Sequence, residues 1–201
     1  MQITVFQLGQ LGANCYIVTD EKAKSCAVVD PGGQGRQLAQ WLRDKGLTPR
    51  LVLLTHGHFD HVGGVQELVG EFPGLPVYLH PNDTKLTPDL SRGLFWTDFY
   101  EDGDELAMDG LTFRVLHTPG HTPGSVCLQV DDVLLTGDTL FAGSCGRTDF
   151  PGGSMEDMMV SLRRIANLEG NLKCYPGHMN ATELDRERTY NSYMRQALRD
   201  A

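Results

Sequence analysis

The sequence has no long apolar run and no excess of positive charge. None of its segments approaches the ~20 consecutive apolar residues of a transmembrane helix, so no membrane contact is expected. Acidic residues outnumber basic ones by 26 to 17, and the formal charge of −9 repels phosphate backbones and anionic membranes. We therefore expect a small-molecule substrate and no nucleic acid as partner. The sequence sets no oligomeric state.

The cysteines are few and the N-terminal segment carries no early positive charge. The five cysteines are odd in number and widely scattered, so their spacing supports neither a disulfide framework nor a CxxC pair. No Lys or Arg precedes Lys22 and no sustained apolar run follows the first residue, which argues against a secretory signal. Both features predict a protein of the reducing cytoplasm.

The remaining composition is that of an ordinary globular protein. Of the 201 residues, 40% are hydrophobic and 21% are charged, which is enough to build a sizeable core. No Pro/Ser-rich linker, charge block, low-complexity tract or repeat divides the chain. We predict a single domain over residues 1–201.

Periodicity predicts strands interleaved with helices. Short β-branched and apolar runs predict strands at 3–8, 15–18, 26–29, 51–54, 77–79, 112–116, 125–130, 133–136 and 172–175. Helical spacing predicts helices at 37–45, 61–71 and 182–198, and another after Ser154, where Asp157 completes an acidic capping box. Residues 81–105 fit no period and are expected to form a loop with a short helix. The expected fold is α+β, with two mostly antiparallel or mixed sheets face to face and helices outside.

The strongest chemical signal is the segment Thr55–His61, which directly follows the apolar run 51–54. It carries four side chains that could bind a metal, and a loop at the end of a strand can turn them toward one point. These candidate ligands are His56, His58, Asp60 and His61. A mixed set of imidazoles and a carboxylate suits zinc, iron or manganese, and is typical of catalytic rather than structural sites.

Three further residues stand at the ends of predicted strands. His121 and His178 each lie on a Gly/Pro turn, and Asp138 closes the run 134–136. Two histidines remain outside this pattern. His80 precedes a proline after a strand and His117 stands four residues before His121, so both are expected to be structural rather than ligands.

The ordered set HxHxDH, His, Asp, His resembles the metallo-β-lactamase-fold hydrolases, and most of all their glyoxalase II (hydroxyacylglutathione hydrolase) branch. The resemblance implies a four-layer αββα sandwich with two divalent metal ions, zinc first, with iron or manganese as alternatives. It implies His56, His58 and His121 on the first metal and Asp60, His61 and His178 on the second. Asp138 would bridge both metals, and Asp60 could also orient the attacking hydroxide.

Two further positions agree with that branch, while other features depart from it. Asp30, in Val28–Gly32, is similar to the early aspartate that orients a metal-binding histidine, and Arg147 is similar to a basic residue that contacts the carboxylate of the thiol cofactor. We expect no counterpart of the helical C-terminal domain of classical glyoxalase II, and its aromatic residue after the last histidine is absent, because Met179 follows His178. The resemblance is therefore to a short single-domain branch, and glutathione specificity is in question.

The expected reaction is hydrolysis of a thioester by hydroxide that the metals supply, because a thiolate leaves without a dedicated general acid. The stretch Cys145–Phe150 also resembles sulfur dioxygenases, which hold one iron with the equivalents of His56, His121 and Asp138. A persulfide dioxygenase is thus the main alternative, and a lactone or other ester hydrolase is the third. Aspartate at position 138 argues against the common dizinc β-lactamases, which have cysteine there, and His58 argues against flavodiiron proteins, which have glutamate.

Overall fold

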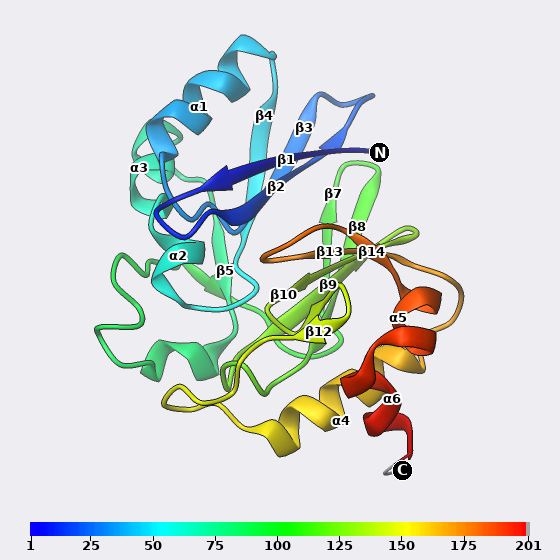
Figure 1. Ribbon diagram of the computed structural model, residues 1–201. Helices are drawn as coiled ribbons and strands as arrows, with labels where there is room; N and C mark the ends of the chain where they lie inside the picture. Colours follow the sequence, from blue (N-terminus) through cyan, green and yellow to red (C-terminus); the bar gives the residue numbers. More distant parts are fainter. Residues whose placement is uncertain (200–201) are drawn as a thin grey trace.

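The computed structural model describes residues 1–199, which form two six-stranded sheets packed face to face (Figure 1). The first sheet has the order β1 (Gln2–Leu8), β2 (Ala13–Asp20), β3 (Ser25–Val29), β4 (Thr48–Leu53), β5 (Val77–Leu79) and β6 (Asp98–Phe99). The second has the order β14 (Thr182–Glu183), β13 (Lys173–Pro176), β10 (Val133–Gly137), β9 (Val126–Val130), β8 (Leu111–His117) and β7 (Glu105–Met108). A small hairpin, β11 (Leu140–Phe141) with β12 (Ser144–Cys145), follows β10.

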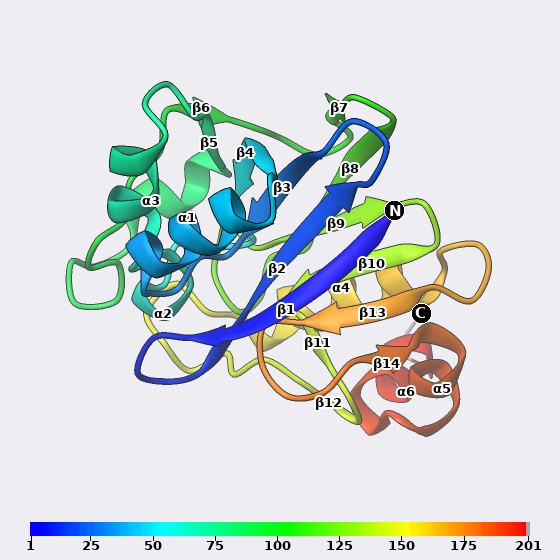
Figure 2. The ribbon, with the colours of Figure 1, turned by 90° about the horizontal axis from the view of Figure 1, so that it is seen from above.

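Helices cover the outer face of each sheet, which completes the four layers (Figure 2). On the first sheet lie α1 (Gly35–Asp44) and α3 (Val65–Glu71), and the short α2 (Phe59–Val62) stands at its edge. On the second lie α4 (Met155–Ala166), α5 (Leu184–Tyr190) and α6 (Ser192–Arg199). The predicted αββα sandwich is confirmed.

Strand β2 shows why the sequence folds this way. Every residue of β2 is buried, because successive side chains point to opposite faces of the sheet and both faces are covered. Cys15 and Ile17 pack with the helices α1 and α3, whereas Tyr16 and Val18 pack with the second sheet. A third apolar cluster joins the second sheet to α4 and α6. The core is thus divided into three layers by the two sheets.

Both sheets are mixed, as predicted. Strands β3, β4, β5 and β6 are parallel neighbours, and β10 pairs with β13 in parallel, while the other pairs are antiparallel. The loops that follow β4 in the first sheet and β10 in the second converge at one edge of the sandwich, where His61 Nε2 lies 3.5 Å from Asp138 Oδ1. Within residues 1–199, no helix combines the length and the apolar character needed to cross a membrane.

The prediction of one helix over 61–71 is wrong. The segment forms α2 and α3, separated at Gly63 and Gly64, where a Cβ would lie 2.8 Å from Gly32 O and 2.6 Å from Gly33 O respectively. The two glycines between the helices let the loop after β3 pack directly against the backbone at this break.

The prediction of one helix over 182–198 is also wrong. The segment contains β14, α5 and α6, and the last two are divided at Asn191. The Asn191 Oδ1 accepts hydrogen bonds from the backbone N–H groups of Tyr193 and Met194, and its Nδ2 donates to Ser144 O at 2.9 Å. A buried asparagine thus starts a new helix and ties it to the β11–β12 hairpin.

Residues 81–105 contain more structure than the predicted loop with a short helix. The short helix exists as a 3₁₀ turn, η1 (Pro81–Lys85), but the segment also contributes strand β6 to the first sheet and begins β7 of the second. The pairing of β6 with β5 spans only two residues on each strand, too few to produce a recognisable period.

The predicted cap of α4 is present and provides a test of local stability. The Ser154 Oγ accepts a hydrogen bond from the Asp157 backbone N–H at 3.1 Å. We expect Ser154→Ala to lower the free energy of unfolding by about 0.5–2 kcal/mol in a urea titration, and Ser154→Asp to retain most of it. Equal losses from the two substitutions would contradict a capping role.

Candidate metal centre

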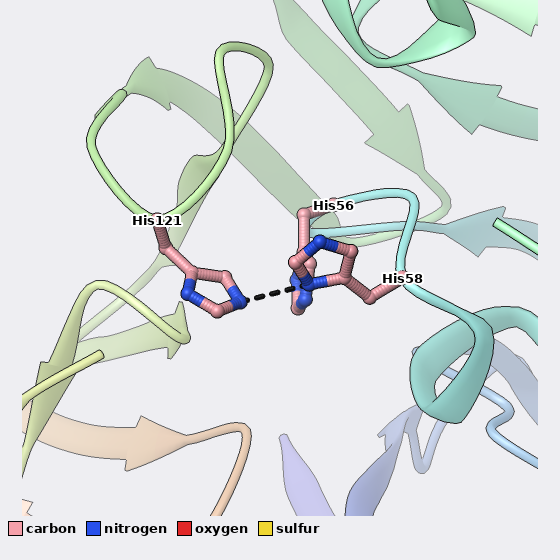
Figure 3. A group of neighbouring side chains, drawn as sticks. All are labelled: His56, His58 and His121. Carbon is pink, nitrogen blue, oxygen red and sulfur yellow. Dashed lines mark hydrogen bonds between the residues drawn. The ribbon is translucent and has the colours of Figure 1, made fainter. Parts of the chain in front are cut away.

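The first group of predicted ligands lies where the loop after β4 meets the loop after β8. His56, His58 and His121 are all buried, and one ring nitrogen of each lies within 4.8 Å of those of the other two. Figure 3 shows the rings of His58 and His121 edge to face, with His58 Nδ1 2.9 Å from His121 Nε2. Among residues 1–199, no group hydrogen-bonds to the buried His56 Nε2.

The second group lies beside the first. Asp60 and His61 are on α2, and His178 is on the loop after β13. The His178 Nε2 lies 3.3 Å from His61 Nε2 and 3.1 Å from Asp60 Oδ2. Residues more than a hundred positions apart in the sequence thus bring three potential ligand atoms to one point.

Asp138 lies between the two groups. Its Oδ1 is 3.5 Å from His61 Nε2, and its Oδ2 is 3.5 Å from His121 Nε2 and 3.8 Å from His178 Nε2. The buried Oδ1 has no hydrogen-bond partner among residues 1–199. The carboxylate therefore lies within 4 Å of histidines from both groups, which is the place that a bridging ligand would take.

The charge states agree with ligand chemistry. Burial, followed by the neighbouring His121 and His61, lowers the pKa of His58 to about 3, so its ring is neutral and offers a lone pair. Burial also lowers the pKa of His56. For His61, burial is outweighed by Asp138, Asp30 and Asp60, which raise the pKa to about 9. A cation beside these carboxylates would take the place of the His61 proton.

Neighbouring groups hold the rings in position. The His61 Nδ1 lies 3.0 Å from Asp30 Oδ2, and the His121 Nδ1–H donates to Arg147 O at 2.7 Å. The Thr55 hydroxyl donates to Asp30 Oδ2 at 2.6 Å, so it accepts from His56 Nδ1 at 3.1 Å. In all three histidines the Nδ1 is engaged, which directs the Nε2 lone pair toward the centre.

The two groups and the carboxylate between them fit a dinuclear metal site. Imidazole and carboxylate ligands suit zinc, iron and manganese alike. The sequence profile of the metallo-beta-lactamase superfamily matches residues 8–178, which covers most of the chain and all seven of these side chains. The chain belongs to this superfamily.

Relatives and solved structures of this superfamily resemble the chain over nearly its whole length. It is 37% identical to the probable metallo-hydrolase YqgX of Bacillus subtilis, over 93% of this chain and 94% of that protein. It is 32% identical to the hydroxyacylglutathione hydrolase GloC of Haemophilus influenzae, over 96% and 98%.

Two crystal structures are especially similar. BLEG-1, a B3 metallo-beta-lactamase, has a TM-score of 0.87 and 32% identity, with 96% of this chain and 99% of that chain covered. TTHA1623, in a di-iron-bound form, has a TM-score of 0.83 and 35% identity, with 94% and 99% covered.

Asp30 carries a strained backbone in this superfamily member. Its φ of 51° is in the left-handed region, which aspartate tolerates better than most residues. The side chain is buried and accepts from the Thr55 backbone N–H at 2.7 Å as well as from the Thr55 hydroxyl and His61. The structure thus places Asp30 in contact with His61, one of the predicted metal ligands.

Arg147, His80 and His117 lie beside the ligand groups rather than within them. The Arg147 guanidinium forms two hydrogen bonds of 2.7 Å with Asp149 and lies 4.0 Å from the centre of the Phe150 ring. His80 and His117 stack with their ring centres 4.1 Å apart. The His117 Nε2–H donates to Pro123 O, next to the turn of His121.

Asp83 is a site residue that the sequence did not indicate. Its fully buried carboxylate accepts from Gly57 N at 2.7 Å, from the Thr122 hydroxyl at 2.9 Å and from Gly124 N at 2.6 Å. Gly57 separates His56 from His58, and Thr122 follows His121. One carboxylate thus joins the two loops that carry the first ligand group. It lies in the segment 81–105, where no motif distinguishes it from the surrounding polar residues.

Substitution of Asp83 tests this link. We expect Asp83→Ala to weaken metal binding by about 10–100-fold, because the two ligand loops lose their common partner. Asp83→Asn keeps one acceptor oxygen, so its metal affinity should lie between that of Asp83→Ala and that of the unsubstituted protein. Competition with a chromophoric chelator measures the affinity, and Asp89→Asn, an exposed position in the same segment, is the control. Equal affinities for Asp83→Ala and the control would contradict a positioning role.

The absence of a side chain at Gly177 makes room for the side chains of Asp138 and His61. A Cβ at this position would lie 2.3 Å from Asp138 Oδ1 and 2.6 Å from His61 Cε1. We expect Gly177→Ala to displace both side chains, to lower the metal content at fixed free metal and to cost about 1–3 kcal/mol of stability.

Gly70 provides the matched control for Gly177, because a Cβ there meets no atom of residues 1–199 within 4 Å. It lies on α3, so Gly70→Ala should keep the metal and should not destabilise the fold. Elemental analysis after equilibration at one metal concentration measures the difference. Full metal content in Gly177→Ala would show that the second ligand group is arranged differently.

Proposed function

We propose that this protein is a metal-dependent hydrolase that cleaves thioesters of the glyoxalase II type. The observation that carries the proposal is the pair of three-ligand groups with the Asp138 carboxylate between them. Both groups open onto one pocket of about 470 Å³, which is lined by His58, Asp60, His121, Asp138 and His178 among others. The similarity to the hydroxyacylglutathione hydrolase of Haemophilus influenzae supports this substrate class, and the similarity to the di-iron-bound form of TTHA1623 supports a dinuclear metal site.

The side chains of this chain would hold two cations side by side. His56, His58 and His121 would hold one, Asp60, His61 and His178 the other, and Asp138 would contact both. Divalent ions so held lower the pKa of a water molecule and polarise a carbonyl. Asp60 is suited to orient that water, because the hydrogen bond from His178 and the charge of His61 outweigh burial and lower the pKa of its carboxyl to about 2.

The pocket favours attack by water over a covalent enzyme intermediate. Cys145 is the thiol among the lining residues, and burial raises its pKa to about 11. It is therefore protonated at neutral pH and a poor nucleophile. A thioester suits a site of this kind because its leaving thiol, with a pKa of about 8.5, departs as the thiolate without protonation.

A β-lactam is the second candidate substrate, and the similarity to BLEG-1 favours it. Both reactions begin with attack on a carbonyl, so the same donor groups would serve either substrate. The leaving groups differ, because an amide nitrogen needs a proton and a thiolate does not. Parallel assays with lactoylglutathione and with a chromogenic cephalosporin distinguish the two.

Metal content and activity of the Asp138 variant test the proposal. Zinc, iron and manganese are supplied separately, and we expect about two metal ions per chain and metal-dependent hydrolysis of lactoylglutathione. Asp138→Ala should lower the activity by about 100-fold or more and reduce the bound metal, because two cations lose the charge between them. His80→Ala is the control and should retain both, since His80 is outside the ligand groups.

The alternative reactions give different results in the same experiment. One iron per chain together with oxygen uptake on glutathione persulfide would identify a dioxygenase and overturn the proposal. Equal losses in Asp138→Ala and His80→Ala would contradict the assignment of the ligands.

A further inference from the structure

The pocket above the ligand groups is walled by apolar side chains. These are Leu11, Phe59, Leu90, Phe141, Phe150 and Met179. They come from the β1–β2 turn, α2, the segment after η1, β11 and the loops before α4 and after β13. Apolar residues from six separate parts of the chain thus surround one opening, and apolar walls with few polar groups are typical of small-molecule sites.

Two of these side chains remain in water in the free protein. Leu11 is 60% exposed and Met179 is 55% exposed. Single exposed apolar residues are common, but here two large ones border the same pocket. A ligand that covers them would gain from the removal of their surface from water.

The backbone holds Met179 in place at a cost. Its φ is 69°, in the left-handed region that a long side chain rarely adopts. The side chain of the buried Asn14 donates hydrogen bonds of 2.9 Å both to Met179 O and to Pro176 O. The fold therefore maintains a strained conformation that sets Met179 beside the opening directly after the ligand His178.

The Arg147 side chain at the opening offers little net attraction to an anionic carrier. Among the residues that line the pocket, Arg147 carries the positive charge. Its guanidinium forms two hydrogen bonds of 2.7 Å with the Asp149 carboxylate. Arg92, nearby, lies 5.1 Å over the ring of Phe59. A carboxylate that approached Arg147 would also approach Asp149, so the attraction and the repulsion largely cancel.

We infer that the substrate of this pocket is an uncharged thioester with an apolar arm, rather than a glutathione ester. The inference rests on the proposed function and narrows it to one class of substrate. The apolar arm would lie against Leu11, Met179 and the phenylalanines, while the thioester carbonyl would face the ligand groups.

Two series of thioesters test the inference with the metal-loaded protein. In one, the acyl group of an N-acetylcysteamine thioester grows from acetyl to octanoyl. In the other, the acetyl group is fixed and an alkyl thiol grows by the same steps. We expect kcat/KM to rise about 2–4-fold per methylene in at least one series, as partial to full burial of each methylene implies. The glutathione ester of the same acyl group should not exceed its N-acetylcysteamine ester.

Variants assign the effect to the wall of the pocket. Leu11→Ser and Met179→Ser should reduce the gain per methylene to less than about 2-fold, because part of the apolar surface is lost. Val160→Ser is the matched control, since Val160 is 57% exposed on α4 and outside this pocket. A slope that is unchanged in both pocket variants would overturn the inference.

Binding of unreactive analogues separates this inference from the proposed function. Ketones in which a methylene replaces the sulfur are titrated into the metal-loaded protein by calorimetry. If no thioester is hydrolysed while long ketones bind more tightly than short ones, the proposed function fails and apolar recognition stands. If thioesters are hydrolysed without any dependence on chain length, or the glutathione ester is preferred by more than tenfold, the inference is wrong and the hydrolase remains.

Discussion

The candidate metal centre depends on the crowding of seven side chains, whose imidazole nitrogens and carboxylate oxygens lie together at one edge of the sandwich. Nitrogens of His58 and His121 lie 2.9 Å apart, and those of His61 and His178 lie 3.3 Å apart. The buried His56 Nε2, His58 Nε2 and Asp138 Oδ1 have no hydrogen-bond partner among residues 1–199, and buried polar atoms of this kind destabilise a fold. Cations placed among these atoms would turn the same crowding into a source of stability, since whatever binds only the folded state stabilises it.

Hydrogen bonds to two buried carboxylates hold in place the loops that carry these side chains. Asp30 joins the end of β3 to Thr55 and His61, and Asp83 joins the loop of His56 and His58 to that of His121. Neither is placed to touch the substrate. Their hydrogen bonds to backbone N–H groups fix the positions of the loops and not of side chains alone, so the protein itself holds together the loops that carry the ligand rings.

The convergence of these seven side chains could be expected from the sequence because most of the signal is local. Four of the seven side chains lie within His56–His61, and the other three stand on turns directly after strands. Asp83 could not be predicted, because its partners Gly57 and Thr122 are identifiable only in three dimensions.

The errors in secondary structure have the same origin. The breaks at Gly63–Gly64 and at Asn191 are set by close contacts with the loop after β3 and with the β11–β12 hairpin, and the local helical period continues through both. The apolar wall was equally hidden, since Leu11 and Met179 are far apart along the chain.

The parallel pairing of β10 with β13 has a consequence for the order in which the site is made. His56, His58, Asp60 and His61 all belong to the part of the chain that a ribosome delivers first, and His178 follows the strand that is added beside β10 near the end of synthesis. A growing chain therefore presents a half-built set of ligands for most of its synthesis. Until β13 is in place, the second ligand group lacks His178 and is incomplete, whereas the first group needs only the earlier loop that carries His121.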